Sequence, residues 1–230
     1  MTVAASPRDL LAKLNEAQRE AVVHGEGPLL VLAGAGSGKT RVLTMRIANL
    51  VREHGVAPSS ILAVTFTNKA AGEMRQRIAV LLGDQPKGMW CGTFHSIGAR
   101  MLRTHAELVG RTASYTIYDE DDYVGLVRRV MERVNVSTRE FAPQAVASVI
   151  SDAKNRLISE SEFANLARDA FSRATAKVYS ALETALRQNN AATFDDLLTL
   201  PVALLEQHAD LRERYQKRFR HILVDEYQDT

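Results

Sequence analysis

The sequence predicts an α/β fold in which a parallel sheet is interrupted by a mostly helical inserted domain. Short apolar runs of strand length alternate with helical segments over residues 1–110, which is typical of βαβ units and a parallel sheet. From about residue 119 to residue 216 the pattern is helical almost throughout. A strand-like apolar run returns only at residues 221–225, so we expect the α/β domain to be split in sequence.

Two short apolar runs, at residues 29–33 and 61–66, predict buried strands, and residues 89–94 are a third strand candidate. Helical spacing of apolar residues predicts helices between and around them. Glycine and proline mark where each helix stops. The expected helices cover residues 10–23, 39–54, 68–82 and 95–109.

The second half begins with a short strand expected at residues 115–118, followed by a run of helices. Asp119 is expected to cap the first of these helices, with Asp122 near the third helical position. We expect breaks between the helices at Pro143, residues 157–159, residues 189–190 and Pro201.

The composition excludes several classes of protein. Hydrophobic residues make up 46% and charged residues 24% of the chain, the balance of a globular protein and not of a disordered, collagen-like or disulfide-scaffold one. The lone Cys91 cannot form an internal disulfide. No apolar run approaches the ~20 residues that span a bilayer, and we see no secretory signal, so we expect a cytoplasmic protein without a membrane partner.

The net charge of +2 is unevenly distributed. Residues 1–110 hold 13 Lys and Arg against 8 Asp and Glu, whereas residues 111–230 hold 16 against 19. The first half is therefore at +5 and the second at −3, so a site for a polyanion would have to be local.

A glycine-rich stretch lies between the predicted strand 29–33 and the predicted helix 39–54, which is the context of a phosphate-binding loop. Its backbone N–H groups and the helix N-terminus would hold phosphates. Lys39 would reach the β- and γ-phosphates, and the Thr40 hydroxyl would bind Mg²⁺. The alternative is a flexible turn with an incidental lysine. The loop consists of Ala33 (at a position where the pattern has glycine), Gly34, Ala35, Gly36, Ser37, Gly38, Lys39 and Thr40.

Two acids at the end of the predicted strand 221–225 supply the other half of such a site. Asp225 would hold Mg²⁺ directly or through water, and Glu226 would orient and deprotonate the attacking water. The pair favours a nucleotide hydrolase over a kinase. A GTPase would need Asn-Lys-x-Asp, but Asn68-Lys69 is followed by Ala70-Ala71.

With these residues in view, the chain resembles the N-terminal part of superfamily 1A DNA helicases of the UvrD/PcrA/Rep type. Six segments in order carry the resemblance: residues 14–22 (the Q motif), 33–40 (motif I), 63–71 (motif Ia), 92–96 (motif Ib), 193–198 (the DNA-facing segment after the insertion) and 224–230 (motif II).

The resemblance implies a RecA-like P-loop NTPase domain, called 1A, at residues 1–113 and 193–230, and a helical insertion, called 1B, at residues 114–192. It also implies ATP and Mg²⁺ as cofactors. Gln18 would bind the adenine edge, Arg41 would lie at the nucleotide, and Gln228 would sense the γ-phosphate or its water.

For DNA, the resemblance implies that Phe66 stacks on a base of a single strand and that Phe194 adds a second aromatic contact. Phe66 could instead be a core aromatic at the end of its strand. Further DNA contacts, or support for the loops that make them, fall to Thr65, Asn68, Thr93 and His95, and basic candidates on the insertion are Arg128, Arg129, Lys154 and Arg156.

By resemblance the parent activity is ATP-dependent 3′→5′ unwinding, with single-stranded DNA and single-strand/duplex junctions as partners. It would need a second RecA-like domain that these 230 residues do not contain. We therefore expect this span alone to bind ATP weakly and to hydrolyse it poorly. Two alternatives stay open: a regulatory ATP- and DNA-binding module, and the helicase arm of a recombination helicase–nuclease.

Overall fold

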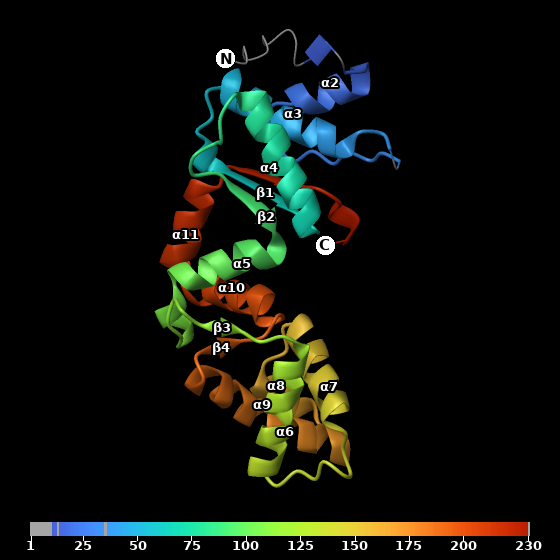
Figure 1. Ribbon diagram of the computed structural model, residues 1–230, viewed down its shortest axis with the longest axis vertical. Coiled ribbons are helices and arrows are strands. Elements are labelled where there is room, and N and C mark those ends of the chain that lie inside the picture. Colours follow the sequence, from blue (N-terminus) through green and yellow to red (C-terminus); the bar gives the residue numbers. More distant parts are fainter. Residues whose placement is uncertain (1–10, 13, 35, 230) are drawn as a thin grey trace. The chain divides into compact units, whose positions relative to one another are not determined.

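The computed structural model describes residues 11–12, 14–34 and 36–229, and the chain divides into two compact units (Figure 1). Unit 1 comprises residues 1–97 and 210–230, and unit 2 comprises residues 98–209. The chain leaves unit 1 within α5 (Phe94–Thr104) and re-enters it at the start of α11 (Ala209–Arg218).

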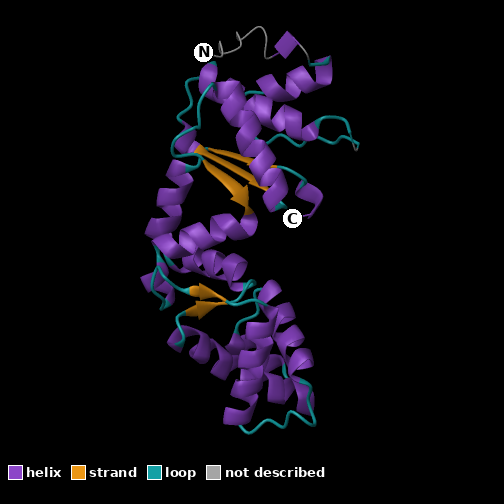
Figure 2. Ribbon diagram, in the orientation of Figure 1, coloured by secondary structure: helices purple, strands orange, loops and turns teal. Residues whose placement is uncertain are grey.

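Unit 1 is built on a three-stranded parallel sheet, drawn as the longer orange arrows in Figure 2. The central strand β1 (Ile61–Thr65) pairs with β2 (Trp90–Thr93) on one side and with β5 (His221–Val224) on the other. In this register Ala63 lies opposite both Cys91 and Leu223. The parallel sheet and the sequence split that feeds it are as predicted.

Helices of unit 1 pack their apolar faces on this sheet and on one another. They are α2 (Glu16–Val23), α3 (Lys39–Arg52), α4 (Asn68–Leu82) and α11, with short 3₁₀ turns η1 (Pro58–Ser60) and η3 (Tyr227–Asp229). The buried core between sheet and helices consists of Ile47, Ile61, Ala63, Met74, Ile78 and Leu223. A second apolar cluster joins α2 to α3 through Leu14, Ala21, Val22 and Val42.

The limits of α4 illustrate how local sequence sets a helix. The Thr67 hydroxyl accepts a hydrogen bond from the Ala70 N–H at 3.1 Å, which caps the first turn. Gly83 ends the helix with φ 82°, a left-handed conformation that favours glycine. The predicted helix at residues 68–82 is therefore confirmed at both ends.

The predicted strand at residues 29–33 is wrong. These residues form no strand, and their side chains are exposed, with Leu30 at 66% and Leu32 at 86%. An apolar run becomes a strand only where a neighbour supplies ladder hydrogen bonds, and among the described residues the ladder ends at β5. Apolar composition indicated burial correctly for β1, whose neighbours exist on both sides.

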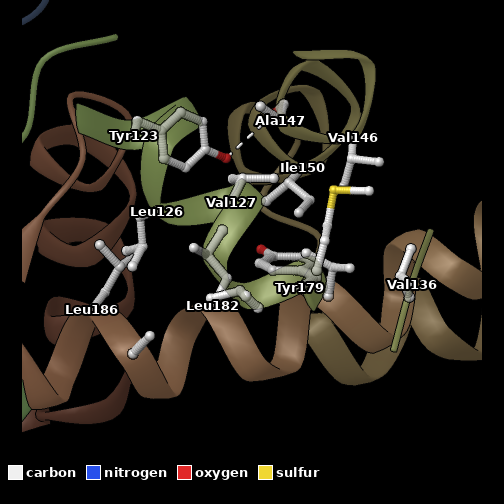
Figure 3. Packing of buried hydrophobic residues seen from close by; sticks show 14 of the residues in the cluster. Tyr123, Leu126, Val127, Val136, Val146, Ala147, Ile150, Tyr179, Leu182 and Leu186 are labelled. Carbon is white, nitrogen blue, oxygen red and sulfur yellow. Dashed lines mark hydrogen bonds between the residues drawn. The ribbon is translucent and has the colours of Figure 1, made fainter. Parts of the chain in front are cut away.

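Unit 2 is a helical assembly around one large core. Its helices are α6 (Glu120–Arg133), α7 (Pro143–Asn155), α8 (Glu160–Leu166), α9 (Ala170–Gln188) and α10 (Asp196–Gln207), with the 3₁₀ turn η2 (Ala106–Val109). Figure 3 shows side chains of α6, α7 and α9 meeting in this core, where the Tyr123 hydroxyl donates to the Ala147 carbonyl at 3.3 Å. The predicted Asp119 cap is confirmed, because its carboxylate accepts from the Asp122 N–H at 2.9 Å.

A two-stranded parallel pair, β3 (Thr116–Ile117) and β4 (Ala191–Ala192), lies within unit 2 between α10 and the helices α6 to α9 (Figure 1). It lies beside a small core of Leu102, Tyr115, Ala192 and Leu197. In the described part of the chain, no helix is both long enough and apolar enough to cross a membrane.

Pro201 does not break a helix as predicted but lies inside α10, where it is buried. Proline has no N–H to donate to the carbonyl four residues earlier, here that of Leu197. α5 approaches that same carbonyl at Gly98, so closely that a Cβ at residue 98 would lie 1.8 Å from the Leu197 oxygen. Tertiary packing of α5 on α10 thus accommodates a proline that sequence alone places at a boundary.

We predict that Gly98→Ala lowers the free energy of unfolding by about 1–3 kcal/mol, the cost of overpacking against backbone that cannot rotate away. Gly72→Ala on α4 is the matched control, because a Cβ there meets nothing within 4 Å. It should be neutral or stabilise by about 0.5–1 kcal/mol through helix propensity. Urea unfolding of both variants checks this, and equal effects would contradict the close approach.

Candidate functional site

The glycine-rich loop and the end of β5 meet in unit 1. The Thr40 hydroxyl donates to the Asp225 carboxylate at 3.1 Å, although the two residues are 185 apart in sequence. Thr40 lies in the first turn of α3, and Asp225 directly follows β5, where its N–H donates to the Val64 carbonyl at 2.8 Å. Asp225 is only 5% exposed. Its backbone bond to β1 holds Asp225 at the sheet, and α3 holds Thr40.

Backbone geometry shapes the loop itself. Gly36 and Gly38 have φ of 74° and 87°, values that side-chain-bearing residues rarely adopt. Gly38 is also the N-cap residue that precedes α3, and it has no side chain to cap the helix N-terminus. The Lys39 ammonium donates to the carbonyls of Ala33 at 3.0 Å and Gly34 at 3.4 Å, so it lies over the loop. Ala35 is outside the described residues.

Gln18 reaches the loop from α2. Its amide nitrogen donates to the Ser37 carbonyl at 2.9 Å, and its amide oxygen accepts from the Asn15 N–H at 3.2 Å. The second bond is half of a capping box with Asn15, so the start of α2 also orients the side chain. Arg41 lies in the first turn of α3, two residues beyond Lys39.

Glu226 stands in a strained backbone conformation, with φ 52°. A left-handed φ is costly for a residue with a Cβ, and such strain concentrates at functional sites. The turn directs the chain from β5 into η3, where the Gln228 side-chain amide donates to the Glu226 carboxylate. The predicted base and the predicted γ-phosphate sensor are therefore in direct contact.

The oxygen donors of Thr40 and Asp225 fit Mg²⁺, a cation that takes few protein ligands and completes its shell with water and phosphate oxygens. Among the described residues, no group of three or more His, Cys, Asp or Glu side chains could hold a metal by itself.

The residues predicted to face DNA in unit 1 differ in accessibility. Phe66 follows β1 with 58% of its surface exposed, and Asn68 is exposed at the start of α4. Thr65 and Thr93 are buried and lie opposite each other in the β1–β2 register, and the Thr93 hydroxyl accepts from the Ser96 N–H at 3.2 Å. Their burial fits loop support better than direct contact. His95 is half-buried in the first turn of α5.

In unit 2 the exposed aromatic is Phe194, at 57%, between β4 and α10. Arg128, Arg129 and Arg156 are exposed on the surface of this unit. Lys154 is not: its side chain is 4% exposed and forms ion pairs with Asp196 at 2.7 Å and Glu183 at 2.5 Å. The suggestion that Lys154 contacts DNA is therefore wrong, because its ammonium faces the interior.

A signal for this burial was present in the sequence. Val146, Ile150 and Lys154 follow one another at spacing four, which places the lysine on the same helix stripe as the core. Burial lowers the pKa of a lysine, but the Asp196 and Glu183 carboxylates outweigh it and raise the pKa of Lys154 above its usual range. The buried charges Arg111, Lys154, Glu183 and Asp196 form what we call the Lys154 cluster.

Comparison with known proteins agrees with this geometry. The model of the UvrD/REP helicase N-terminal domain matches residues 14–230. The ATP-dependent DNA helicase PcrA of Leuconostoc citreum is 45% identical over 94% of the chain, and that of Staphylococcus aureus is 44% identical over 96%. The ATP-dependent DNA helicase UvrD1 of Mycobacterium tuberculosis is 47% identical over 98%.

The chain spans about 30% of the length of these relatives. Within that span the family model covers all of the described site, from Gln18 to Gln228. The chain therefore belongs to the UvrD/REP helicase N-terminal domain family.

Proposed function

We propose that this chain is the ATP- and single-stranded-DNA-binding portion of an ATP-dependent DNA helicase that moves 3′→5′. The names of its relatives support an ATP-driven helicase. The observation that carries the ATP half of the proposal is the 3.1 Å bond between Thr40 and Asp225, which joins a phosphate-loop residue to the strand-end acid that a nucleotide hydrolase requires.

In this proposal each site residue has one task. The loop N–H groups and Lys39 bind the phosphates, and the start of α3 adds its partial positive charge. Thr40 and Asp225 hold Mg²⁺, which neutralises phosphate charge when bound. Glu226 accepts a proton from the attacking water, and its contact with Gln228 couples the base to the residue that senses the γ-phosphate. Gln18 and Arg41 bind the nucleoside side of ATP.

The DNA half rests on the exposed aromatic rings. Phe66 and Phe194 offer stacking faces that any base can use, as a sequence-independent translocase needs. Unit 1 then corresponds to the core of domain 1A and unit 2 to the inserted region, with boundaries at residues 113 and 193 in our assignment and at 97 and 209 by compactness. A second RecA-like domain, single-strand/duplex junctions and a cytoplasmic location complete the proposal.

The ATP site is tested by Lys39→Ala, which we expect to weaken ATP binding about 10-fold or more through loss of charge-assisted hydrogen bonds. Lys87→Ala, an exposed lysine away from the loop, is the control and should leave affinity unchanged. Calorimetric titration with a non-hydrolysable ATP analogue and Mg²⁺ measures both. Binding unaffected by Lys39→Ala would contradict the site and favour a regulatory module. Robust DNA-stimulated turnover by these 230 residues would contradict our expectation of weak hydrolysis.

We expect the left-handed backbone of Glu226 to lower the stability of the fold, whereas its side chain serves as the proposed base. Glu226→Gly removes the cost of a left-handed φ and is expected to raise the free energy of unfolding by up to about 1 kcal/mol. Glu226→Gln keeps the strain and should leave stability unchanged. Both variants lose the proposed base. Thermal melts rank the three proteins, and a glycine variant less stable than the glutamine variant would contradict the strain.

Phe66→Ala should weaken binding of a fluorescein-labelled oligo-dT by about 1–3 kcal/mol at fixed salt, because one stacking face is lost. Phe66→Trp should retain affinity. Val80→Ala is the matched control, since Val80 is another exposed apolar residue of unit 1, on α4. Fluorescence anisotropy measures all three, and equal losses for Phe66→Ala and Val80→Ala would remove Phe66 from the DNA path.

A further inference from the structure

The Lys154 cluster lies inside unit 2 and joins four separate stretches of it. Lys154 on α7 bonds to Asp196 at the start of α10 and to Glu183 on α9. Arg111, after η2, places its guanidinium 3.7 Å from Asp196 and donates to the Ala191 carbonyl at 2.7 Å. The side chains of Lys154, Arg111 and Asp196 are all at least 96% buried, and two cations balance two carboxylates.

Asp196 transmits this hold to the segment that carries Phe194. Its carboxylate accepts from the Thr193 N–H at 2.9 Å, and the Thr193 hydroxyl accepts from the Asp196 N–H at 3.2 Å. The neighbouring Asp195 carboxylate accepts from the Ser151 hydroxyl at 2.6 Å. Ser151 and Lys154 lie one turn apart on α7, so a single helix holds both acids that follow Phe194.

Phe194 is the exception within this fixed segment. Thr193 before it and Asp196 two residues after it are 2% and 1% exposed and Asp195 is half-buried, whereas Phe194 is 57% exposed. It borders a cavity of about 480 Å³ whose other walls include Tyr118 and Gln144 and the acidic residues Asp119, Glu120, Asp152 and Asp195. The segment therefore leaves Phe194 largely exposed, while hydrogen bonds between Thr193 and Asp196 hold the backbone on its two sides.

A buried ion cluster is weak evidence for stability, because apolar packing of the same volume stabilises a fold equally well or better. Charged groups add directional hydrogen bonds to the packing, and each of these bonds fixes the position of its partner group. Here that position is the backbone of residues 193–196. The pKa of Asp196, lowered by the Lys154 ammonium against the opposing effect of burial, keeps this carboxylate ionised.

We propose that Lys154 is a positioning residue for DNA binding: through Asp196 it holds residues 193–196 in the conformation that presents Phe194 to a base. This rests on the proposed function, in which Phe194 stacks on single-stranded DNA. A ring whose position is fixed before binding loses less conformational entropy when a base stacks on it. Replacing Lys154 should therefore lower the affinity for DNA, although Lys154 does not itself contact the DNA.

A double-mutant cycle tests the proposal. Phe194→Ala should weaken oligo-dT binding about 5-fold or more. Lys154→Met should weaken it by a similar factor, yet weaken it by less than about twofold when Phe194→Ala is already present, because both act through one ring. Additive losses would overturn the positioning role. Affinity for an ATP analogue, whose site is in unit 1, should be unchanged in every variant.

Two further variants keep the test decisive if Lys154→Met unfolds unit 2. Lys154→Met combined with Glu183→Gln removes one charge of each sign and leaves Arg111 to balance Asp196. It should fold and still lose DNA affinity. Glu183→Gln alone removes an equal buried charge but no bond to residues 193–196, so DNA affinity should stay within about twofold. A loss of affinity in Glu183→Gln that matches Lys154→Met would indicate general destabilisation and overturn the proposal.

Hydrogen exchange separates the remaining outcomes. The Thr193 amide should exchange faster in the double variant Lys154→Met, Glu183→Gln than in Glu183→Gln alone, when the two proteins have equal global stability. If Phe194→Ala leaves DNA affinity intact, the assignment of Phe194 under the proposed function fails. If Phe194→Ala weakens binding but the folded Lys154 variants do not, only the positioning proposal fails.

Discussion

Parallel pairing of β1 with β5 is the constraint on which unit 1 depends. The two strands are separated by more than 150 residues in sequence, and their register sets Ile61 opposite His221 and Val64 opposite Val224. The next backbone hydrogen bond, from the Asp225 N–H to the Val64 carbonyl, places the Asp225 carboxylate at the end of the sheet, next to the start of α3. Closing so long a loop is entropically costly, and residues 98–209, which lie between the two strands in sequence, offset that cost by folding around a core of their own.

The two units hold their functional segments by different physical means. In unit 1 the loop depends on backbone freedom: left-handed glycines at 36 and 38, and a strained Glu226. Such conformations need the surrounding sheet and helix to maintain them. In unit 2 the segment around Phe194 depends on buried charges, whose bonds are directional and whose desolvation makes a missing partner expensive. In the proposed function, the loop of unit 1 surrounds phosphates, and the segment of unit 2 holds the Phe194 ring in a fixed position.

Close packing explains features that look unfavourable in isolation. Pro201 inside α10 leaves the Leu197 carbonyl without its usual helical donor, and Gly98 lets α5 approach that oxygen. Thr65 and Thr93 are buried at the end of the sheet, where the Thr93 hydroxyl accepts a hydrogen bond from the chain, and Phe66 beside them remains exposed. Buried neighbours thus determine which of several strand-end residues is left accessible for a ligand.

The sequence by itself determined the local features: the Asp119 cap and the Gly83 stop both follow from hydrogen bonding and backbone conformation within a few residues. Tertiary structure alone decided the rest. Residues 29–33 needed a strand neighbour, Pro201 needed a tolerant partner helix, and Lys154 needed two carboxylates distant in sequence to be buried as an ion. Composition and spacing report how a residue prefers to be placed, but partners that satisfy its hydrogen bonds and charge come from elsewhere in the chain.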